Sequence, residues 1–367
     1  MTWKNRLIKA LLWIFNPEAT RPAHPKVPTS FLIVSTTGLG DTLWGTPAMR
    51  ALRQSFPDAE ISVLTSSIGA AVLEHNKHID ELFVLGPSPF FSLLRFFSAL
   101  RKRKFDAVLV FHTSKRMVLP FCALLEAPQI IGTEGINKDL DFLLTKALPQ
   151  KYQHEIERRL EIVREAGAYV SDYALELSFR KKEEYNARRF LEGHGIPEHI
   201  PLVGLHPGAK NLFKQWPKES FIEVGNRLNR HLGCQILVSG DQSEALLVLE
   251  IASKIPGAIP LAGELDLSSF SALLKKMLVF ITNDTGPMHM AFATGTPTVA
   301  IFGPTDPNLC GPFHVKNAHV LATPKTCTSC LKKNCADPFC LLAIGPDAVY
   351  DAALTSLPAN DHYPAGL

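Results

Sequence analysis

The sequence predicts an α/β protein built from two doubly wound domains, and three observations support that prediction. At 367 residues the chain exceeds the usual size of one hydrophobic core, and 46% hydrophobic with 20% charged residues is ordinary globular usage. Short apolar runs alternate with helical patterns, as parallel sheets require. Two glycine-bearing turns, one near residues 36–42 and one near 283–287, each lead from an apolar run into a helical pattern.

The apolar runs form two series of expected strands. The first series is 31–36, 60–65, 81–85, 106–111 and 128–132, and the second is 201–206, 234–239, 258–261, 278–282 and 297–302. A charge-rich helical stretch separates them, so we expect the boundary near residues 170 to 185. The predicted domains are therefore 30–177 and 178–345, followed by a tail at 346–367. Ligands bind at the carboxyl ends of such strands, so both glycine-bearing turns are expected on one central cleft.

Residues 1–16 mix Lys4, Arg6 and Lys9 with tryptophan, leucine, isoleucine and phenylalanine. This apolar run is too short to span a bilayer and has no clear signal-peptide cleavage site. It favours an amphipathic helix at an anionic membrane interface, with a helix packed on its own protein as the alternative. The proline-rich residues 17–29 are predicted to be a linker.

The formal net charge of +3 is too small to indicate a nucleic-acid partner. Basic residues do cluster locally, at Arg101 to Lys104 and at Lys115 and Arg116. Such clusters suit a local anionic partner. A solvated helix end explains Arg101 to Lys104 equally well.

The segment NDTGPMHMAFATGTP, residues 283–297, has the composition of a phosphate-binding helix start. We expect Asp284 to cap the helix, Gly286 to let an anion approach the backbone, and Pro287 to occupy the first turn. His289, one turn later, is expected to face the same ligand. The alternative is a well-capped crossover helix without a ligand.

The earlier turn carries Gly38, Gly40 and Asp41 after an apolar run. Only two of its glycines fit the dinucleotide fingerprint, and no GKS or GKT follows as a P-loop requires. We therefore expect a loop that brings Asp41 into a cleft. A third element, residues 202–221, contains Lys210 and Lys214, which could reach phosphate oxygens or simply be solvated.

These motifs together resemble glycosyltransferase family 9, the bacterial lipopolysaccharide heptosyltransferases, and most closely the heptosyltransferase II branch. The resemblance is carried by GLGDTLWGTPAMRALR, by HPG followed by KQWP, and by NDTGPMHMAFATGTPTVAIFGPTDP, and it spans about residues 30 to 345. It implies a GT-B fold of two Rossmann-like domains, the N-terminal one for the acceptor and the C-terminal one for the donor.

The resemblance further implies inverting transfer of heptose from ADP-heptose to the inner core of lipopolysaccharide at the cytoplasmic face of the inner membrane. Asp41 matches the family's catalytic aspartate and would be the base beside the acceptor hydroxyl. No metal is required for catalysis in the family, so protein groups would stabilise the leaving diphosphate. The positions that match the donor site are Lys214, Asp284, Thr285, Gly286 and His289.

Other positions are weaker candidates. Asp241 or Gln242 could bind the ribose or adenine, although a helix cap is an equal explanation. His112, Lys115 and Arg116 follow an expected strand and could contact phosphates or carboxylates of the acceptor. His154 matches a histidine at the same place in the family.

Cys327, Cys330, Cys335 and Cys340 form the pattern CxxCx4Cx4C within residues 327–340. Four thiolates could hold a structural zinc or iron ion, although the second pair is wider than usual. Reduced thiols are the alternative, with a disulfide less favoured in a cytosolic protein.

Two classes of function remain open at this stage. The first is a transferase that acts on a lipid-linked acceptor, with another nucleotide sugar or a protein or capsule acceptor as variants. The second is a noncatalytic nucleotide-sugar-binding protein of the same fold. Asp41 together with Lys214 favours catalysis, since a binder needs no carboxylate opposite the leaving group.

Overall fold

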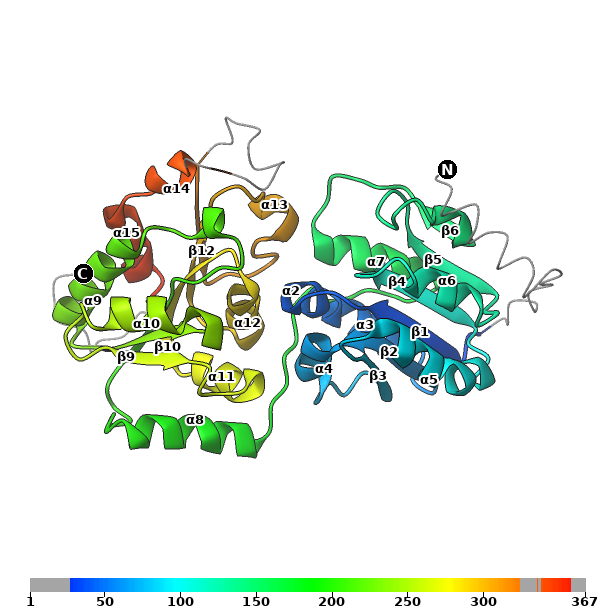
Figure 1. The fold of residues 1–367 in the computed structure, drawn as a ribbon, viewed down its shortest axis with the longest axis horizontal. Helices are drawn as coiled ribbons and strands as arrows, with labels where there is room; N and C mark the ends of the chain where they lie inside the picture. Colours follow the sequence, from blue (N-terminus) through cyan, green and yellow to red (C-terminus); the bar gives the residue numbers. More distant parts are fainter. Residues whose placement is uncertain (1–26, 324–334, 336–337, 358–367) are drawn as a thin grey trace. The chain divides into compact units, whose positions relative to one another are not determined.

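The computed structural model describes residues 27–323, 335 and 338–357. The chain divides into two compact units, one up to Glu176 and one from Leu177 onward. Each has its own parallel six-stranded sheet with helices on its faces (Figure 1). The expected interfacial helix and most of the expected linker lie outside the described residues. The shared cleft stays a prediction.

The N-terminal unit orders its strands β3-β2-β1-β4-β5-β6. The strands are β1 (Ser30–Ser35), β2 (Glu60–Ser66), β3 (Glu81–Leu85), β4 (Ala107–His112), β5 (Gln129–Thr133) and β6 (Lys146–Leu148). The helices are α2 (Leu39–Leu43), α3 (Thr46–Ser55), α4 (Ser67–Leu73), α5 (Pro89–Lys102), α6 (Val118–Ala123) and α7 (Glu155–Glu165), with a 3-10 turn η1 (Asp141–Leu143). The strand order reverses between β1 and β4, which is where doubly wound sheets bind ligands.

The C-terminal unit repeats this order as β9-β8-β7-β10-β11-β12, counted from the same edge. Its strands are β7 (Leu202–His206), β8 (Gln235–Gly240), β9 (Ile259–Ala262), β10 (Met277–Asn283), β11 (Thr298–Phe302) and β12 (Ala318–Ala322). Its helices are α8 (Lys181–Gly193), α9 (Lys218–Leu232), α10 (Ala245–Ala252), α11 (Leu267–Leu274), α12 (Gly286–Thr294), α13 (Pro307–Cys310), α14 (Phe339–Leu342) and α15 (Pro346–Thr355), with 3-10 turns η2 (Leu212–Lys214) and η3 (Gln242–Glu244). Here the order reverses between β7 and β10.

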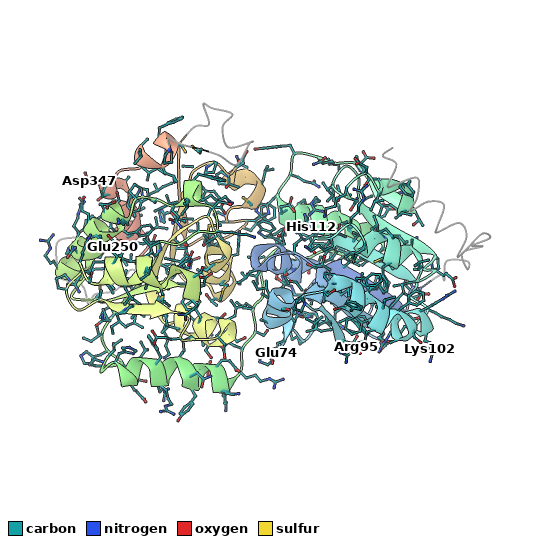
Figure 2. The ribbon with its side chains drawn as sticks, viewed as in Figure 1. Glu74, Arg95, Lys102, His112, Glu250 and Asp347 are labelled. Atoms are coloured by element: carbon teal, nitrogen blue, oxygen red, sulfur yellow. The ribbon has the colours of Figure 1, made fainter. Side chains whose placement is uncertain are left out.

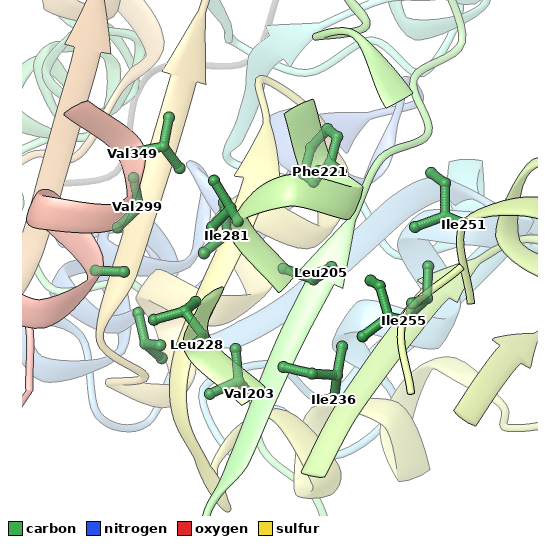
Figure 3. Packing of buried hydrophobic residues seen from close by; sticks show 14 of the residues in the cluster. Val203, Leu205, Phe221, Leu228, Ile236, Ile251, Ile255, Ile281, Val299 and Val349 are labelled. Atoms are coloured by element: carbon green, nitrogen blue, oxygen red, sulfur yellow. The ribbon is translucent and has the colours of Figure 1, made fainter. Parts of the chain in front are cut away.

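The central strands of each sheet are buried, because they are continuous apolar runs covered on both faces. All six residues of β1 and all five of β11 are buried. In the C-terminal unit, side chains of β7, β8, β10 and β11 pack with those of α9, α10 and α15 (Figure 3). Burial of this kind supplies most of the free energy that holds each unit together.

All ten expected strands are present, but each unit has a sixth strand that the sequence analysis missed. β6 has three residues, and β12 reads AHVLA with four of its five residues half-buried, so neither shows a long apolar run. The predicted tail is also partly wrong. Residues 346–355 form α15, whose Val349 and Ala353 are fully buried in the core. None of the described helices has the length and apolarity needed to span a membrane.

Candidate functional site

Asp41 lies in a short helix rather than in the expected loop. It occupies the first turn of α2, directly after β1 and at the carboxyl edge of the N-terminal sheet. About a third of its side chain (30%) is exposed, so its carboxylate is accessible to a ligand. The position is the one where the strand order reverses, as the sequence analysis expected for a cleft residue.

A fully buried arginine holds this carboxylate. Arg159 of α7 places Nη2 3.3 Å from Asp41 Oδ1 and Nη1 2.6 Å from Glu155 Oε2, and it has no exposed side-chain surface. Its guanidinium also stacks 5.3 Å from the ring centre of Trp44. A buried guanidinium is tolerated only when it is paired and packed in this way. Arg159 therefore fixes where the Asp41 carboxylate lies.

Glu155 balances the charge of two neighbouring arginines. Arg158 donates to Glu155 at 2.7 Å and to the carbonyl of Phe111 in β4 at 2.9 Å, which ties α7 to the sheet. Burial alone would raise the pKa of Glu155, but the positive charges of Arg159 and Arg158 outweigh it and lower that pKa to about 2. Glu155 therefore stays ionised.

His112 ends β4, and its Nδ1 is buried without a hydrogen-bond partner among the described residues (Figure 2). Burial lowers the pKa of His112, against the opposing effect of the Asp41 charge. The ring as a whole is half-buried, so a sugar hydroxyl could reach only its exposed part and not the buried Nδ1. His154 is less available. It is buried, and its Nδ1 accepts from the backbone N–H of Ile156 at 3.1 Å as the N-cap of α7.

Lys138 joins the predicted cations Lys115 and Arg116. Its ammonium donates to the carbonyls of Thr113 and Ser114, in the loop that carries the other two. Burial and the charges of Lys115 and Arg116 lower the pKa of Lys138. Lys138 and the next residue both have φ near +57°, which is unusual for residues other than glycine. Three cations thus gather after β4.

In the C-terminal unit, a buried asparagine fixes the loop that follows β7. Asn283, at the end of β10, accepts from the backbone N–H of Trp216 at 3.0 Å and donates to the carbonyl of Pro207 at 2.8 Å. Trp216 is 2% exposed, and its Nε1 donates to Ile344. The loop containing Lys214 is therefore held against the carboxyl end of β10, at the point where the strand order reverses.

Lys214 and Asp284 form an ion pair within this unit. Lys214 Nζ lies 2.5 Å from Asp284 Oδ2, and Asp284 is 8% exposed. This corrects the expected cap, because α12 begins with Thr285 as its N-cap residue and no side chain accepts from its first N–H groups. Asp284 instead orients Lys214.

The beginning of α12 has the features of a helix start that can bind an anion, and the phosphate site itself stays a prediction. Thr285 is the N-cap, Gly286 is the first helical residue and a proline occupies the first turn, so backbone N–H groups and the positive end of the helix dipole face outward. His289 is 3% exposed and packs edge-on against Phe292, with ring centres 5.9 Å apart. Lys214, Thr285 and the first amides of α12 are thus gathered on one edge. Lys210, in the same loop, is exposed.

Asp241 caps η3, the alternative that the sequence analysis left open. Its Oδ1 accepts hydrogen bonds from the backbone N–H groups of Ser243 and Glu244. The pKa of Asp241 is lowered, chiefly by the hydrogen bond from the Ser243 side chain. Gln242 is exposed on this turn. The Glu244 carboxylate packs against Gly208 so closely that a Cβ atom added to Gly208 would lie 2.1 Å from it. Burial raises the pKa of Glu244.

His206 is a buried residue that the sequence analysis did not assign to the site. Ser239 Oγ donates to the carbonyl of Leu205 and therefore accepts from His206 Nδ1 at 3.1 Å, which leaves His206 Nε2 as an acceptor. Burial lowers the pKa of His206 to about 4, although the charge of Asp241 opposes the shift. A neutral acceptor thus ends β7.

Cys327 and Cys330 lie outside the described residues, whereas Cys335 and Cys340 are half-buried. Within the part of the chain that the structure describes, no group of three or more histidine, cysteine or acidic residues could hold a metal ion. The metal site therefore stays a prediction.

Comparison with known proteins gives the family. The model of "Glycosyltransferase family 9 (heptosyltransferase)" matches residues 93–339, about two thirds of the chain. The chain belongs to glycosyltransferase family 9. It is therefore a glycosyltransferase, as the three motifs predicted.

Individual relatives of this family 9 protein agree. Lipopolysaccharide heptosyltransferase 3 of Escherichia coli is 28% identical over 282 residues, covering 73% of this chain and 81% of the relative. A family 9 glycosyl transferase from Veillonella parvula superposes with a TM-score of 0.81 at 24% identity, covering 91% of this chain and 99% of that one. The E. coli heptosyltransferase WaaC with ADP-2-deoxy-2-fluoro heptose gives 0.67 at 19% identity, covering 88% and 98%. These likenesses confirm the GT-B fold.

Proposed function

We propose that this family 9 protein transfers heptose from ADP-heptose to the inner core of lipopolysaccharide, with inversion at the anomeric carbon. The names of its relatives support the sugar and the acceptor, since one is a lipopolysaccharide heptosyltransferase and another binds an ADP-heptose analogue. The observation that carries the proposal is the buried Arg159, which holds the accessible Asp41 carboxylate. A protein that only binds a nucleotide sugar has no use for such a group.

In the proposed reaction, Asp41 removes the proton from the acceptor hydroxyl. The hydroxyl oxygen forms its bond to the anomeric carbon while the bond from that carbon to the phosphate oxygen breaks on the opposite face. The electron pair leaves with ADP. Lys214, the Thr285 hydroxyl and the first backbone amides of α12, including that of Gly286, are suited to stabilise the developing diphosphate charge. His289 is proposed to contact the donor from the same helix.

For the acceptor, we propose that His112 binds a sugar hydroxyl and that Lys115, Arg116 and Lys138 bind phosphate or carboxylate groups of the core. The place of the half-buried His112 at the end of β4 and the three gathered cations support these roles. His154 would act by shaping the start of α7. For the donor, Gln242 suits contacts to the ribose or adenine better than Asp241 or Glu244 does, because both carboxylates already cap η3.

We further propose that the lipid-linked acceptor brings the protein to the cytoplasmic face of the inner membrane. Residues 1–16, which lie outside the described part of the chain, stay the predicted interfacial helix. A zinc or iron ion bound by Cys327, Cys330, Cys335 and Cys340 would be structural, since the proposed reaction uses only protein groups.

The test is transfer from ADP-heptose to a delipidated inner-core acceptor, followed by release of ADP and by product mass. Asp41→Asn keeps the size of the side chain but removes the base, so kcat should fall about 100-fold or more. Asp58→Asn, at an exposed site of the same unit, is the matched control and should keep full activity. Nuclear magnetic resonance of the new glycosidic bond reports inversion.

Full activity of Asp41→Asn would refute the base assignment. The lipopolysaccharide core of a strain without this protein should lack one heptose by mass spectrometry. An unchanged core would refute the acceptor and favour a protein or capsule glycan. Transfer from a different nucleotide sugar would refute the donor while keeping the mechanism.

A further inference from the structure

Helix α5 of the N-terminal unit exposes three large apolar side chains next to one another. Phe90, Phe91 and Leu94 are 52%, 69% and 58% exposed, and the two phenylalanine rings pack edge-on with centres 5.5 Å apart. They lie within the first two turns of a 14-residue helix. Exposed apolar residues are ordinary when single, but a contiguous group on one helix marks a contact surface.

The hydrophobic core does not account for these three side chains. The opposite face of α5 supplies the core with Leu93 and Leu100, which are buried, and with Phe96 and Phe97, which are partly buried. At 100° per residue, Phe91 and Leu94 lie on the side of the helix away from these four residues. The helix therefore has two apolar faces, and only one of them packs on the sheet.

Positive charge accompanies the exposed apolar face. Residues 82–105 contain no aspartate or glutamate and five basic residues. Arg101 pairs with Glu126, and Arg103 pairs with Glu60 and Glu81. Arg95, Lys102 and Lys104 have no carboxylate within ion-pair distance among the residues that the structure describes.

Arg95 and Lys102 lie two turns apart and project along the same side of α5 (Figure 2). At 100° per residue, both lie within about 40° of Phe91, on the side of Phe91 away from Leu94. We call Phe90, Phe91, Leu94, Arg95 and Lys102 the α5 face.

We propose that the α5 face binds the surface of an anionic lipid bilayer. Aromatic and leucine side chains partition into the boundary between headgroups and acyl chains, while arginine and lysine bind the negative headgroups. The absence of acidic residues from this stretch removes the repulsion that such a surface would otherwise exert. An ordinary protein partner would more often meet a mixture of both charges around an apolar centre.

Of the cluster from Arg101 to Lys104, for which the sequence alone left a solvated helix end as an equal explanation, the proposal gives a role to Lys102, whereas Arg101 and Arg103 are held in ion pairs. It assigns a membrane contact within the N-terminal unit, in addition to the interfacial helix expected at residues 1–16. The proposed membrane contact rests on the proposed function only in its biological purpose, since that contact would bring the enzyme to a lipid-linked acceptor. Binding to lipid requires neither donor nor acceptor, so it can be measured separately.

The experiment is co-sedimentation of the full chain with vesicles of equal parts phosphatidylglycerol and phosphatidylcholine, and with phosphatidylcholine alone. The wild type should bind the anionic vesicles and lose binding as salt is raised. Phe91→Ser with Leu94→Ser, and separately Arg95→Glu with Lys102→Glu, should each weaken binding about tenfold or more. Transfer to the delipidated acceptor should not change in either variant, which shows that the fold is intact.

The C-terminal unit offers matched controls. Leu246 is an exposed leucine on α10 and Lys182 an exposed lysine on α8, so Leu246→Ser and Lys182→Glu remove equivalent groups elsewhere. Both should bind vesicles as the wild type does. Unchanged binding of the two α5 variants would overturn the proposal, as would an equal loss in the controls. If the α5 variants instead altered only self-association, measured by sedimentation velocity, the face would be an interface between copies and the proposal would be wrong.

Discussion

At the residue scale, the Asp41 carboxylate depends on a side chain that is itself out of reach of any ligand. Arg159 is fully buried, and its two terminal nitrogens are divided between Asp41 and Glu155. Only a planar, forked donor can serve two carboxylates and stack on Trp44 at once. Arg159 is therefore a positioning residue rather than a catalytic one.

Replacing Arg159 should slow the chemical step without weakening the binding of the donor. In Arg159→Lys the charge remains but the second hydrogen bond and the stacking are lost, so kcat should fall about 10-fold or more, since small displacements of a base are costly. The KM for ADP-heptose should stay within about twofold of the wild-type value, because the groups proposed to bind the donor are unchanged. Steady-state kinetics at saturating acceptor measure both values.

A conservative change beside Arg159 provides the control. Arg164→Lys alters a partly exposed arginine of the same helix that pairs with Glu157 instead of Asp41. It should leave kcat unchanged. A rise in KM alone for Arg159→Lys would contradict the positioning role, and circular dichroism would reveal a folding defect.

At the element scale, the Lys214 and Asp284 pair joins the loop after β7 to the start of α12. The pair has two roles that mutation can separate. Asp284 is nearly buried, so it needs a positive partner for stability, whereas Lys214 is 24% exposed and can also reach a diphosphate.

Lys214→Gln should therefore damage both stability and donor binding. It leaves the Asp284 carboxylate unpaired, which should lower the free energy of unfolding by about 2 kcal/mol. Lys214→Gln combined with Asp284→Asn should recover most of that loss, because two amides can bond to each other, but the KM for ADP-heptose should stay raised. Urea unfolding and steady-state kinetics of both variants and of Asp284→Asn complete the cycle. Recovery of the donor KM in the double variant would mean that Lys214 serves only Asp284.

The same elements show what the sequence could predict. Hydrophobic periodicity and glycine-bearing turns identified ten of the twelve strands that the structure describes and placed Asp41 and Lys214 after strand ends, because those signals are local. Arg159 was missed, although it shares a helix face with Ile156 and Val163, and a charge on an apolar face is a signal of a buried pair. Asp284 was expected to cap α12 but instead pairs with Lys214. An aspartate can serve either purpose, and only the folded structure shows that Lys214 lies beside Asp284.

At the scale of the whole molecule, both units keep neutral histidines in their interiors. His78 and His112 in the N-terminal unit and His206 in the C-terminal unit all have lowered pKa values, each chiefly because burial disfavours the charged ring. The unfolded chain binds these protons more readily than the folded one. Their contribution to the free energy of unfolding is therefore fully present above the ordinary histidine pKa of about 6.5 and falls as the pH drops below it.

Glu155, with a pKa of about 2, behaves in the opposite sense, but its stabilisation is lost only below its ordinary pKa of about 4.5. Loss of stability between pH 7 and pH 5 therefore reports the histidines rather than this carboxylate. For His206 the shift to about 4 sets an upper limit of about 3 kcal/mol, reached only near pH 4.

His206→Gln should make the protein less sensitive to acid. A glutamine can keep a hydrogen bond to Ser239 but binds no proton, so the fall in the free energy of unfolding from pH 7 to pH 5 should be smaller by about 1 kcal/mol or more. Urea unfolding at a series of pH values measures the slope. His199→Gln, at an exposed site of the same unit, is the matched control and should keep the wild-type slope. If His206→Gln kept that slope as well, His206 would have to be charged or solvated in the folded protein, and its assignment as a neutral acceptor at the end of β7 would be wrong.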